Sequence, residues 1–279
     1  MTVTPAAASI PTSVPDERVD RPVSTGAVLG ALLRRDLRVA RRELQYFLVR
    51  TLMQPLLFLI VFGFLLPKME FVHGGYTTAL LPGIIAVSVA LSAIQAVALP
   101  MVQDFGWTRE IEDRLLAPVP TPLIATEKVL AGAVQGVVAA LIALPLGRLV
   151  MGPIPGLTLE NLVAFISITA LGALTFSAIG LVLGTAIAPQ QIGLMFSIIV
   201  APMLMFGCAY YPWRGLDRVP AMKYAVLVNP LVYVAEGMRA TITPEAPHMP
   251  ILAATGALVL LATAFWYIGR RTFLRKAVG

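Results

Sequence analysis

Charged residues are scarce in this chain of 279 residues, in which Asp, Glu, Lys and Arg together make up 13%. A soluble domain carries roughly a quarter charged residues, so the composition excludes an ordinary water-soluble protein. Hydrophobic residues reach 58%, which is typical of a membrane protein. The net charge of +6 comes from basic residues beside the apolar segments. That placement favours membrane topology and anionic lipid over nucleic acid as its cause.

Cysteine and histidine are almost absent. The single cysteine, Cys208, excludes a disulfide within the chain. The two histidines, His73 and His248, lie far from Cys208 and from any acidic cluster, so we predict no metal site. The sequence also lacks a G-x-x-x-x-G-K-[ST] phosphate loop and the G-x-S-x-G and H-E-x-x-H motifs. Nothing forms a catalytic constellation, so we predict that the chain is not an enzyme and binds no cofactor.

Six apolar segments approach the roughly 20 residues that a helix needs to cross a bilayer. These predicted spans cover residues 48–66, 78–101, 129–150, 162–188, 192–209 and 251–269. Their interiors hold no Asp or Glu, whereas an ion-driven transporter usually needs such a group within the membrane. No internal repeat is evident either. The sequence therefore predicts an all-α membrane protein and disfavours a secondary transporter.

The N-terminal region has two parts. Residues 1–25 are rich in Ala, Pro, Thr and Val without periodicity, which predicts a disordered tail rather than a signal peptide. Residues 26–46 place leucines on one side of a helical wheel and basic residues on the other, a pattern typical of a helix in the membrane interface. The alternative is a helix packed on a soluble domain, but no such domain is present. The basic face consists of Arg34, Arg35, Arg38, Arg41 and Arg42.

The distribution of Lys and Arg sets the predicted orientation. If the N-terminus is cytoplasmic, the predicted inner side carries clearly more basic residues than the outer side. The positive-inside rule then places both termini in the cytoplasm, together with the connection between the second and third spans.

That connection, residues 103–128, gathers many of the charges of the chain. Charged groups do not sit in hydrocarbon, so we predict a loop in water or against a partner. Residues 107–116 are expected to form a short helix, with Glu110 and Arg114 in the favourable i, i+4 order. Three prolines then end the helix. A solvated connector is the alternative interpretation.

The segment 210–250 is too long for a simple turn and is amphiphilic rather than polar. Pro230 interrupts its apolar run, so this run should not cross the membrane. We predict two short helices that dip into the outer leaflet and break at Asn229-Pro230. An ordered outer cap without further function is the alternative to a gate.

Two stretches carry a family resemblance. The run "WTREIEDRLLAPVPTPLIATEKVL" resembles the first cytoplasmic loop of permease subunits in type-2 ABC exporters, and "NPLVYVAEGMR" resembles the region before their last span. The resemblance covers residues 26–276 and implies a single transmembrane domain, with residues 26–46 as its elbow helix. It further implies a coupling helix that docks on an ATP-binding subunit and an outer gate. The coupling residues would be Arg109, Glu110, Arg114 and Leu115, and the gate residues Asn229, Pro230 and Arg239.

The implied function is the membrane subunit of an ATP-driven exporter in a bacterial plasma membrane. ATP and Mg²⁺ would bind to the separate ATPase subunit, and a second permease copy or a sister permease would complete the pathway. The chain looks most like drug and lipid exporters of the daunorubicin-permease kind, which implies efflux and antibiotic resistance. Export of polysaccharide or teichoic acid is the nearest alternative. A membrane enzyme using Glu160, Glu236 or His248 is less favoured, since these residues show no motif spacing.

Overall fold

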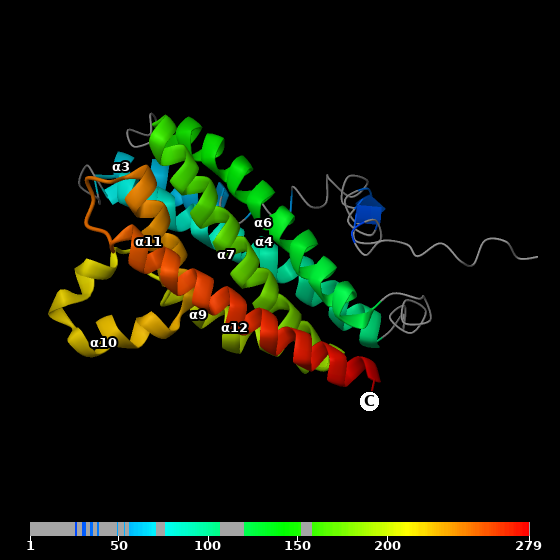
Figure 1. Ribbon diagram of the computed structural model, residues 1–279. Helices are drawn as coiled ribbons and strands as arrows, with labels where there is room; N and C mark the ends of the chain where they lie inside the picture. Colours follow the sequence, from blue (N-terminus) through cyan, green and yellow to red (C-terminus); the bar gives the residue numbers. More distant parts are fainter. Residues whose placement is uncertain are drawn as a thin grey trace, which may run out of the picture.

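The computed structural model describes residues 56–70, 76–106, 120–151 and 158–278, with a few isolated positions between 26 and 53. Every secondary-structure element in these ranges is helical, which confirms the predicted all-α class. Four helices are long and lie side by side in an elongated bundle (Figure 1). They are α4 (Tyr76–Gly106), α6 (Thr121–Met151), α7 (Leu159–Ala186) and α12 (Ile251–Val278).

The four long helices are each apolar and long enough to cross a membrane. They correspond to the predicted spans 78–101, 129–150, 162–188 and 251–269. The helices α4 and α6 have 31 residues each, about 46 Å at the α-helical rise, against a hydrocarbon thickness of about 30 Å. Their ends therefore extend beyond the predicted spans and carry polar residues past the apolar layer.

The two remaining predicted spans correspond to shorter apolar helical stretches, Leu56–Lys68 and Pro189–Met205, so the structure does not confirm the count of six. The first contains η1 (Leu59–Leu65) and α3 (Leu66–Lys68). The second is a succession of η2 (Pro189–Gln191), α8 (Ile192–Met195), η3 (Phe196–Val200) and α9 (Ala201–Met205). Helix α9 ends before the predicted limit of residue 209, and Cys208 just beyond it has a positive φ of 53°, which a helix cannot accommodate.

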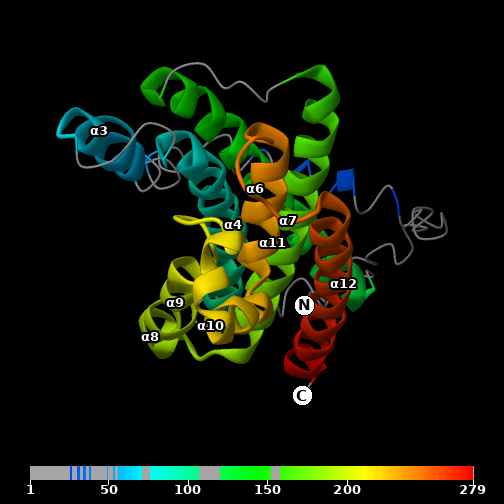
Figure 2. The ribbon, with the colours of Figure 1, turned by 90° about the vertical axis from the view of Figure 1, so that its left-hand side faces the viewer.

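A run of short helices then leads back to the bundle (Figure 2). It comprises η4 (Trp213–Arg218), α10 (Pro220–Ala225), η5 (Val226–Val228) and α11 (Pro230–Ile242). The predicted break at Asn229-Pro230 is present, between η5 and α11. Helix α11 packs against α4, α7 and α12, and nearly all its residues are buried. Its 13 residues span about 20 Å, so it is too short to cross a bilayer alone.

The two ends of the bundle differ in which helix termini they bring together. At the C-terminal end, the end of α4 and the start of α6 meet the last turns of α12, with Met101, Ile124 and Phe273 in one buried cluster. At the opposite end, which we call the far end, α6 ends beside the start of α4: a Cβ added to Gly147 would lie 2.2 Å from Leu81 Cδ1. Helix α4 is the most buried span and α12 the least.

Candidate functional site

The predicted coupling residues Arg109, Glu110, Arg114 and Leu115 lie outside the described residues, as do Arg41 and Arg42 of the predicted interfacial helix. Of that helix, Arg34, Arg35 and Arg38 are described as helical and exposed. The placement of the coupling residues therefore stays a prediction. The structure does describe the two helix ends that flank them, α4 ending at Gly106 and α6 beginning at Thr121, both at the C-terminal end of the bundle.

These flanking helix ends bury charged side chains. Asp104 on α4 and Glu127 and Lys128 on α6 are 7%, 2% and 7% exposed, and Lys128 Nζ lies 3.9 Å from Glu127 Oε2. The prediction of one polar loop over residues 103–128 is thus wrong at both ends, because residues 103–106 belong to α4 and residues 121–128 to α6. Burying charges is costly unless they are paired, and Glu127 and Lys128 lie close enough to offset each other's charge.

A second buried charge pair lies on α11. Glu236 and Arg239 stand one turn apart, and both side chains are 0% exposed. Glu236 Oε1 accepts a hydrogen bond from Arg239 Nη1. Glu and Arg are almost never fully buried unless they are paired. Even a paired set costs more in desolvation than its attraction returns unless the other polar atoms also find partners.

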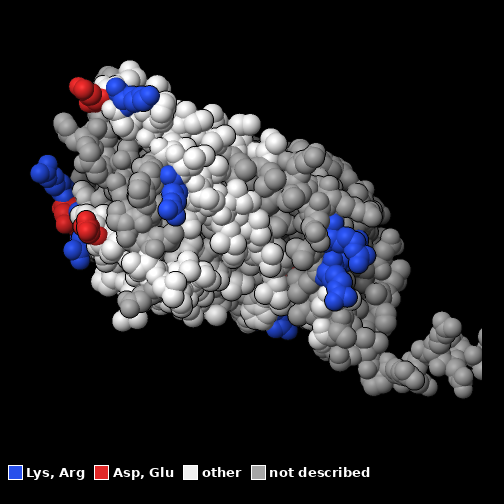
Figure 3. All heavy atoms as spheres, turned by 90° about the horizontal axis from the view of Figure 1, so that it is seen from above, with Lys and Arg blue, Asp and Glu red and all other residues white. Residues whose placement is uncertain are grey.

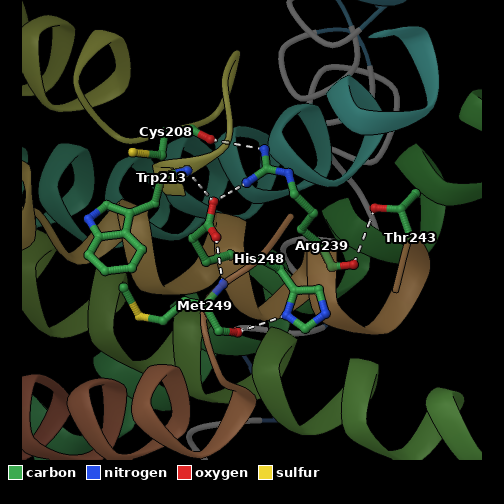
Figure 4. A network of polar contacts seen from close by, with 7 residues as sticks. Cys208, Trp213, Arg239, Thr243, His248 and Met249 are labelled. Carbon is green, nitrogen blue, oxygen red and sulfur yellow. Dashed lines mark hydrogen bonds and ion pairs between the residues drawn. The ribbon is translucent and has the colours of Figure 1, made fainter. Parts of the chain in front are cut away.

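Backbone groups from two other segments supply those partners (Figure 4). Glu236 Oε1 also accepts a hydrogen bond from the backbone N–H of Trp213 at 2.9 Å, and Oε2 accepts one from that of Met249 at 2.8 Å. Arg239 Nη2 donates to the carbonyl oxygen of Cys208 at 3.1 Å. We call these five residues the clasp. It joins the stretch after α9, helix α11 and the loop between α11 and α12.

The clasp has the character of a structural joint rather than a reaction centre. Both charged side chains are enclosed, and besides the bond between them they make hydrogen bonds to the backbone of the same chain. The loop beyond it is held further, since Thr243 Oγ1 donates to the Arg239 carbonyl at 3.2 Å and His248 Nδ1 lies 2.9 Å from the Met249 carbonyl oxygen. Among the described residues, no group of His, Cys, Asp and Glu could hold a metal ion.

The predicted gate residues Asn229 and Pro230 form the start of α11. Asn229 Oδ1 accepts a hydrogen bond from the backbone N–H of Leu231 at 3.0 Å, an N-cap, while Pro230 occupies the first helical turn, where no N–H is needed. Asn229 Nδ2 donates to the carbonyl oxygen of Met203 on α9 at 2.6 Å. Asn229 thus ties the start of α11 to α9, and Arg239 ties α11 to the backbone at Cys208.

Glu236 is the site residue that the sequence analysis missed. The sequence offers it only as a possible enzyme residue, for which the motif spacing is missing. A usable signal was present, because an acid and a base at i, i+3 in an otherwise apolar helix lie on the same face and can pair.

The structure has four long apolar helices around a buried core, charged residues at the helix ends and an enclosed ion pair on a short helix. These features define a multi-pass α-helical membrane protein. Residues 27–243 match the family described as "ABC-2 type transporter", and the chain belongs to that family. The chain is 29% identical over 237 residues to the inner membrane transport permease YadH of Escherichia coli (strain K12). The alignment covers 79% of this chain and 86% of that protein. The proteins of the same name from Escherichia coli O157:H7 and Shigella flexneri match equally well.

Proposed function

We propose that this chain is the membrane-spanning permease subunit of an ATP-driven ABC exporter that moves a lipophilic drug or lipid-like molecule out of the cytoplasm or the inner leaflet. The observation that carries the proposal is the family match, which covers the bundle from before its first described helix to the end of α11. The similarity to a protein named an inner membrane transport permease supports a role in transport at a bacterial inner membrane.

The proposed route of coupling starts at residues 107–116. An ATP-binding subunit docks on Arg109, Glu110, Arg114 and Leu115, and closure of its ATP-bound dimer pushes on this segment. The push reaches the bundle through helix ends that are packed rather than loose. Phe105 on α4 lies 5.7 Å, edge to face, from Phe273 on α12. Motion of the segment therefore acts on α4, α6 and α12 together.

The moving part at the far end is α11 in this proposal. It enters the bundle from the far end without crossing, as a re-entrant helix, and the clasp makes it one body with the stretches on either side. Asn229, Pro230 and Arg239 hold α11 to these stretches, so that they move together as part of an outer gate. A second permease copy or a sister permease provides the other half of the pathway, and ATP and Mg²⁺ bind only to the partner ATPase.

The absence of Asp and Glu from the predicted spans favours a lipophilic cargo over ions or sugars. Export of polysaccharide or teichoic acid is the second candidate, since the resemblance noted in the sequence extends to permeases with the same layout. A purified complex distinguishes the two, because lipophilic drugs and lipids would stimulate its ATP hydrolysis and polysaccharide precursors would not.

The test of the proposal is co-purification with a candidate ATP-binding subunit from the same source. The variant is Glu110→Arg/Arg114→Glu, which reverses both coupling charges and keeps the net charge. We expect the native chain to form a complex that hydrolyses ATP and the variant to lose the complex or its coupling. Arg214→Glu/Glu245→Arg is the matched control, since both residues are exposed at the far end. Equal loss in the control, or full activity of the coupling variant, contradicts the proposed docking site.

A further inference from the structure

The last turns of α12 form a one-sided charge cluster. Residues 251–278 contain four basic residues and no Asp or Glu. Arg271, Arg275 and Lys276 are exposed and Arg270 is half-buried. Among the described residues, the acids nearest to this end of the bundle are Asp104 and Glu127, and both are buried. The face seen from above in Figure 3 shows mixed red and blue side chains at one end of the molecule and only blue ones toward the other.

Aromatic rings border this basic cluster. Arg270 lies 5.7 Å from the ring centre of Trp266, Arg271 4.4 Å from that of Tyr267, and Lys276 Nζ 5.0 Å from that of Phe105. Tyr267 is 47% exposed. Trp and Tyr beside an apolar helical stretch mark the level of the lipid headgroups, and the cation–π contacts direct the cations to the same level.

The length of α12 sets the depth of the cluster in the membrane. From Ile251 to Ile268 the helix covers 18 residues, about 27 Å, close to the hydrocarbon thickness of about 30 Å. The basic residues begin two positions later. They are therefore at the depth of the phosphate groups of the leaflet at the C-terminal end, which is the cytoplasmic leaflet in the proposed orientation.

The turns of α12 that carry the cluster pack against neighbouring helices. Phe273 is 0% exposed and packs with Met101 and Ile124, and Thr272 Oγ1 lies 2.8 Å from Thr185 Oγ1 on α7. Arg271 and Arg275 are i, i+4 neighbours, and like charges at this spacing repel unless an anion lies between them. Because the helix beneath them is packed, the backbone that carries these cations loses little conformational freedom when an anion binds.

We propose that Arg271, Arg275 and Lys276 bind the phosphate headgroup of an anionic phospholipid at the corner formed by α4, α6 and α12. The aromatic belt and the depth favour a lipid over an acidic surface of a partner protein. The helix ends at this corner flank residues 107–119, so the bound lipid steadies the elements on which the proposed ATPase contact depends. The lipid site itself does not require that contact.

The test is binding of phosphatidylglycerol, compared with phosphatidylcholine, to the purified full chain by native mass spectrometry. The variant Arg271→Gln/Arg275→Gln/Lys276→Gln removes the three exposed charges. Each basic residue near an anionic surface contributes about a fivefold factor in affinity, so we expect at least a tenfold weaker binding of phosphatidylglycerol. Binding of phosphatidylcholine should not change. Arg271→Lys/Arg275→Lys keeps the charge and should keep most of the binding.

Lys68→Gln/Arg214→Gln/Arg218→Gln is the matched control, because it removes three charges from the far end. It should leave phosphatidylglycerol binding at the C-terminal end unchanged. Equal binding of the two lipids by the native chain, or an equal loss in the control, overturns the proposal. A third outcome also overturns it: the variant Arg271→Gln/Arg275→Gln/Lys276→Gln still binds phosphatidylglycerol but no longer binds an ATP-binding subunit in lipid-free detergent. The cluster would then be a contact for a protein partner.

Discussion

At the residue scale, Glu236 and Arg239 carry opposite charges in a place that water does not reach. Their attraction alone does not justify the burial, because an apolar pair of similar size is often as stable. What distinguishes the pair is where its remaining hydrogen bonds go. They reach the backbone at Cys208, Trp213 and Met249, on both sides of α11 in the sequence. The pair therefore selects one arrangement of three segments.

Removing one member of this pair should destabilise the protein more than removing both. Arg239→Met leaves the Glu236 carboxylate buried without its cation, and Glu236→Ala leaves the guanidinium buried and two backbone N–H groups unpaired. We expect each change to cost about 3–5 kcal/mol. The double variant Glu236→Gln/Arg239→Met should cost less than either single change. Thermal unfolding in detergent, monitored by tryptophan fluorescence, measures the order of stabilities.

Two further variants keep this comparison interpretable. Glu236→Gln retains an oxygen acceptor for one N–H group and should be milder than Glu236→Ala. Glu245→Gln removes an exposed acid from the neighbouring loop and should have little effect. If the effects of Glu236→Gln and Arg239→Met prove additive in the double variant, the two side chains do not act as a unit and the clasp is not a structural joint.

The sequence predicted Arg239 as a site residue but not its partner. It was named through the resemblance, whereas pairing required knowledge that α11 is buried on nearly every side. An amphiphilic run of 13 residues does not reveal that burial, because a helix with polar residues on one face is expected to expose that face. The partners at Cys208, Trp213 and Met249 are backbone groups, which no side-chain pattern encodes.

At the element scale, α4 is the helix against which the others are placed. Its apolar window is the most buried of the four spans. Small residues allow the close approaches: a Cβ added to Gly180 on α7 would lie 2.8 Å from the carbonyl oxygen of Ile94, and one added to Gly184 would lie 2.7 Å from Met101 Cβ. Packing at this distance replaces the hydrophobic effect, which does not drive helices together within lipid.

The tightest approach predicts a sharp mutational effect at Gly83. A Cβ there would lie 1.6 Å from the carbonyl oxygen of Ala209, which is backbone and cannot rotate away. Gly83→Ala should therefore displace the stretch after α9 and cost at least about 1–3 kcal/mol, as overpacked sites do. Thermal unfolding of the purified protein in detergent provides the measurement.

Gly256 on α12 supplies the opposite case within the same protein. Nothing lies within 4 Å of its added Cβ, so Gly256→Ala should be neutral or stabilising by up to about 1 kcal/mol through helix propensity. Similar stability for the two variants would show that α4 and the stretch after α9 are not in the close contact seen in the structure.

The sequence predicted the existence of the long helices better than their limits. Hydropathy marks the part of a helix that lies in hydrocarbon, so 129–150 was predicted where α6 begins at Thr121. Glu127 and Lys128 belong to that helix because neighbouring helices bury them. Hydropathy counts such residues as loop. The end of α9 was misplaced for a different reason: Gly207, Cys208 and Ala209 are apolar, but the backbone there leaves the helical region.

At the scale of the whole molecule, the number of apolar helices does not by itself give the number of membrane crossings. Helix α11 is buried like a span but is too short to be one. The stretch Pro189–Met205 is also shorter than the four long helices. The number of crossings therefore depends on whether residues on either side of α11 emerge on the same side of the membrane.

Labelling of single introduced cysteines in intact cells determines this topology. The background is Cys208→Ala; native Cys208 is buried and should itself be unreactive. Tyr224 and Glu245 flank α11 and are exposed, as are Gln190 and Lys276 at the C-terminal end. Cysteines at 224 and 245 should both react with a membrane-impermeant maleimide added outside. Those at 190 and 276 should react only after the cells are made permeable, since the positive-inside rule places that end in the cytoplasm.

The pattern of reactive positions separates the possible topologies. If cysteines at 224 and 245 are labelled from opposite sides of the membrane, α11 crosses it. The clasp would then belong to a membrane span and not to an outer gate. Labelling of 190 from outside would mean that Pro189–Met205 does not connect the two faces. Outside labelling of 276 would invert the orientation. The segment 107–119, which begins and ends at the same end of the bundle as Lys276, would then face away from any cytoplasmic ATPase, and the proposed coupling would fail with it.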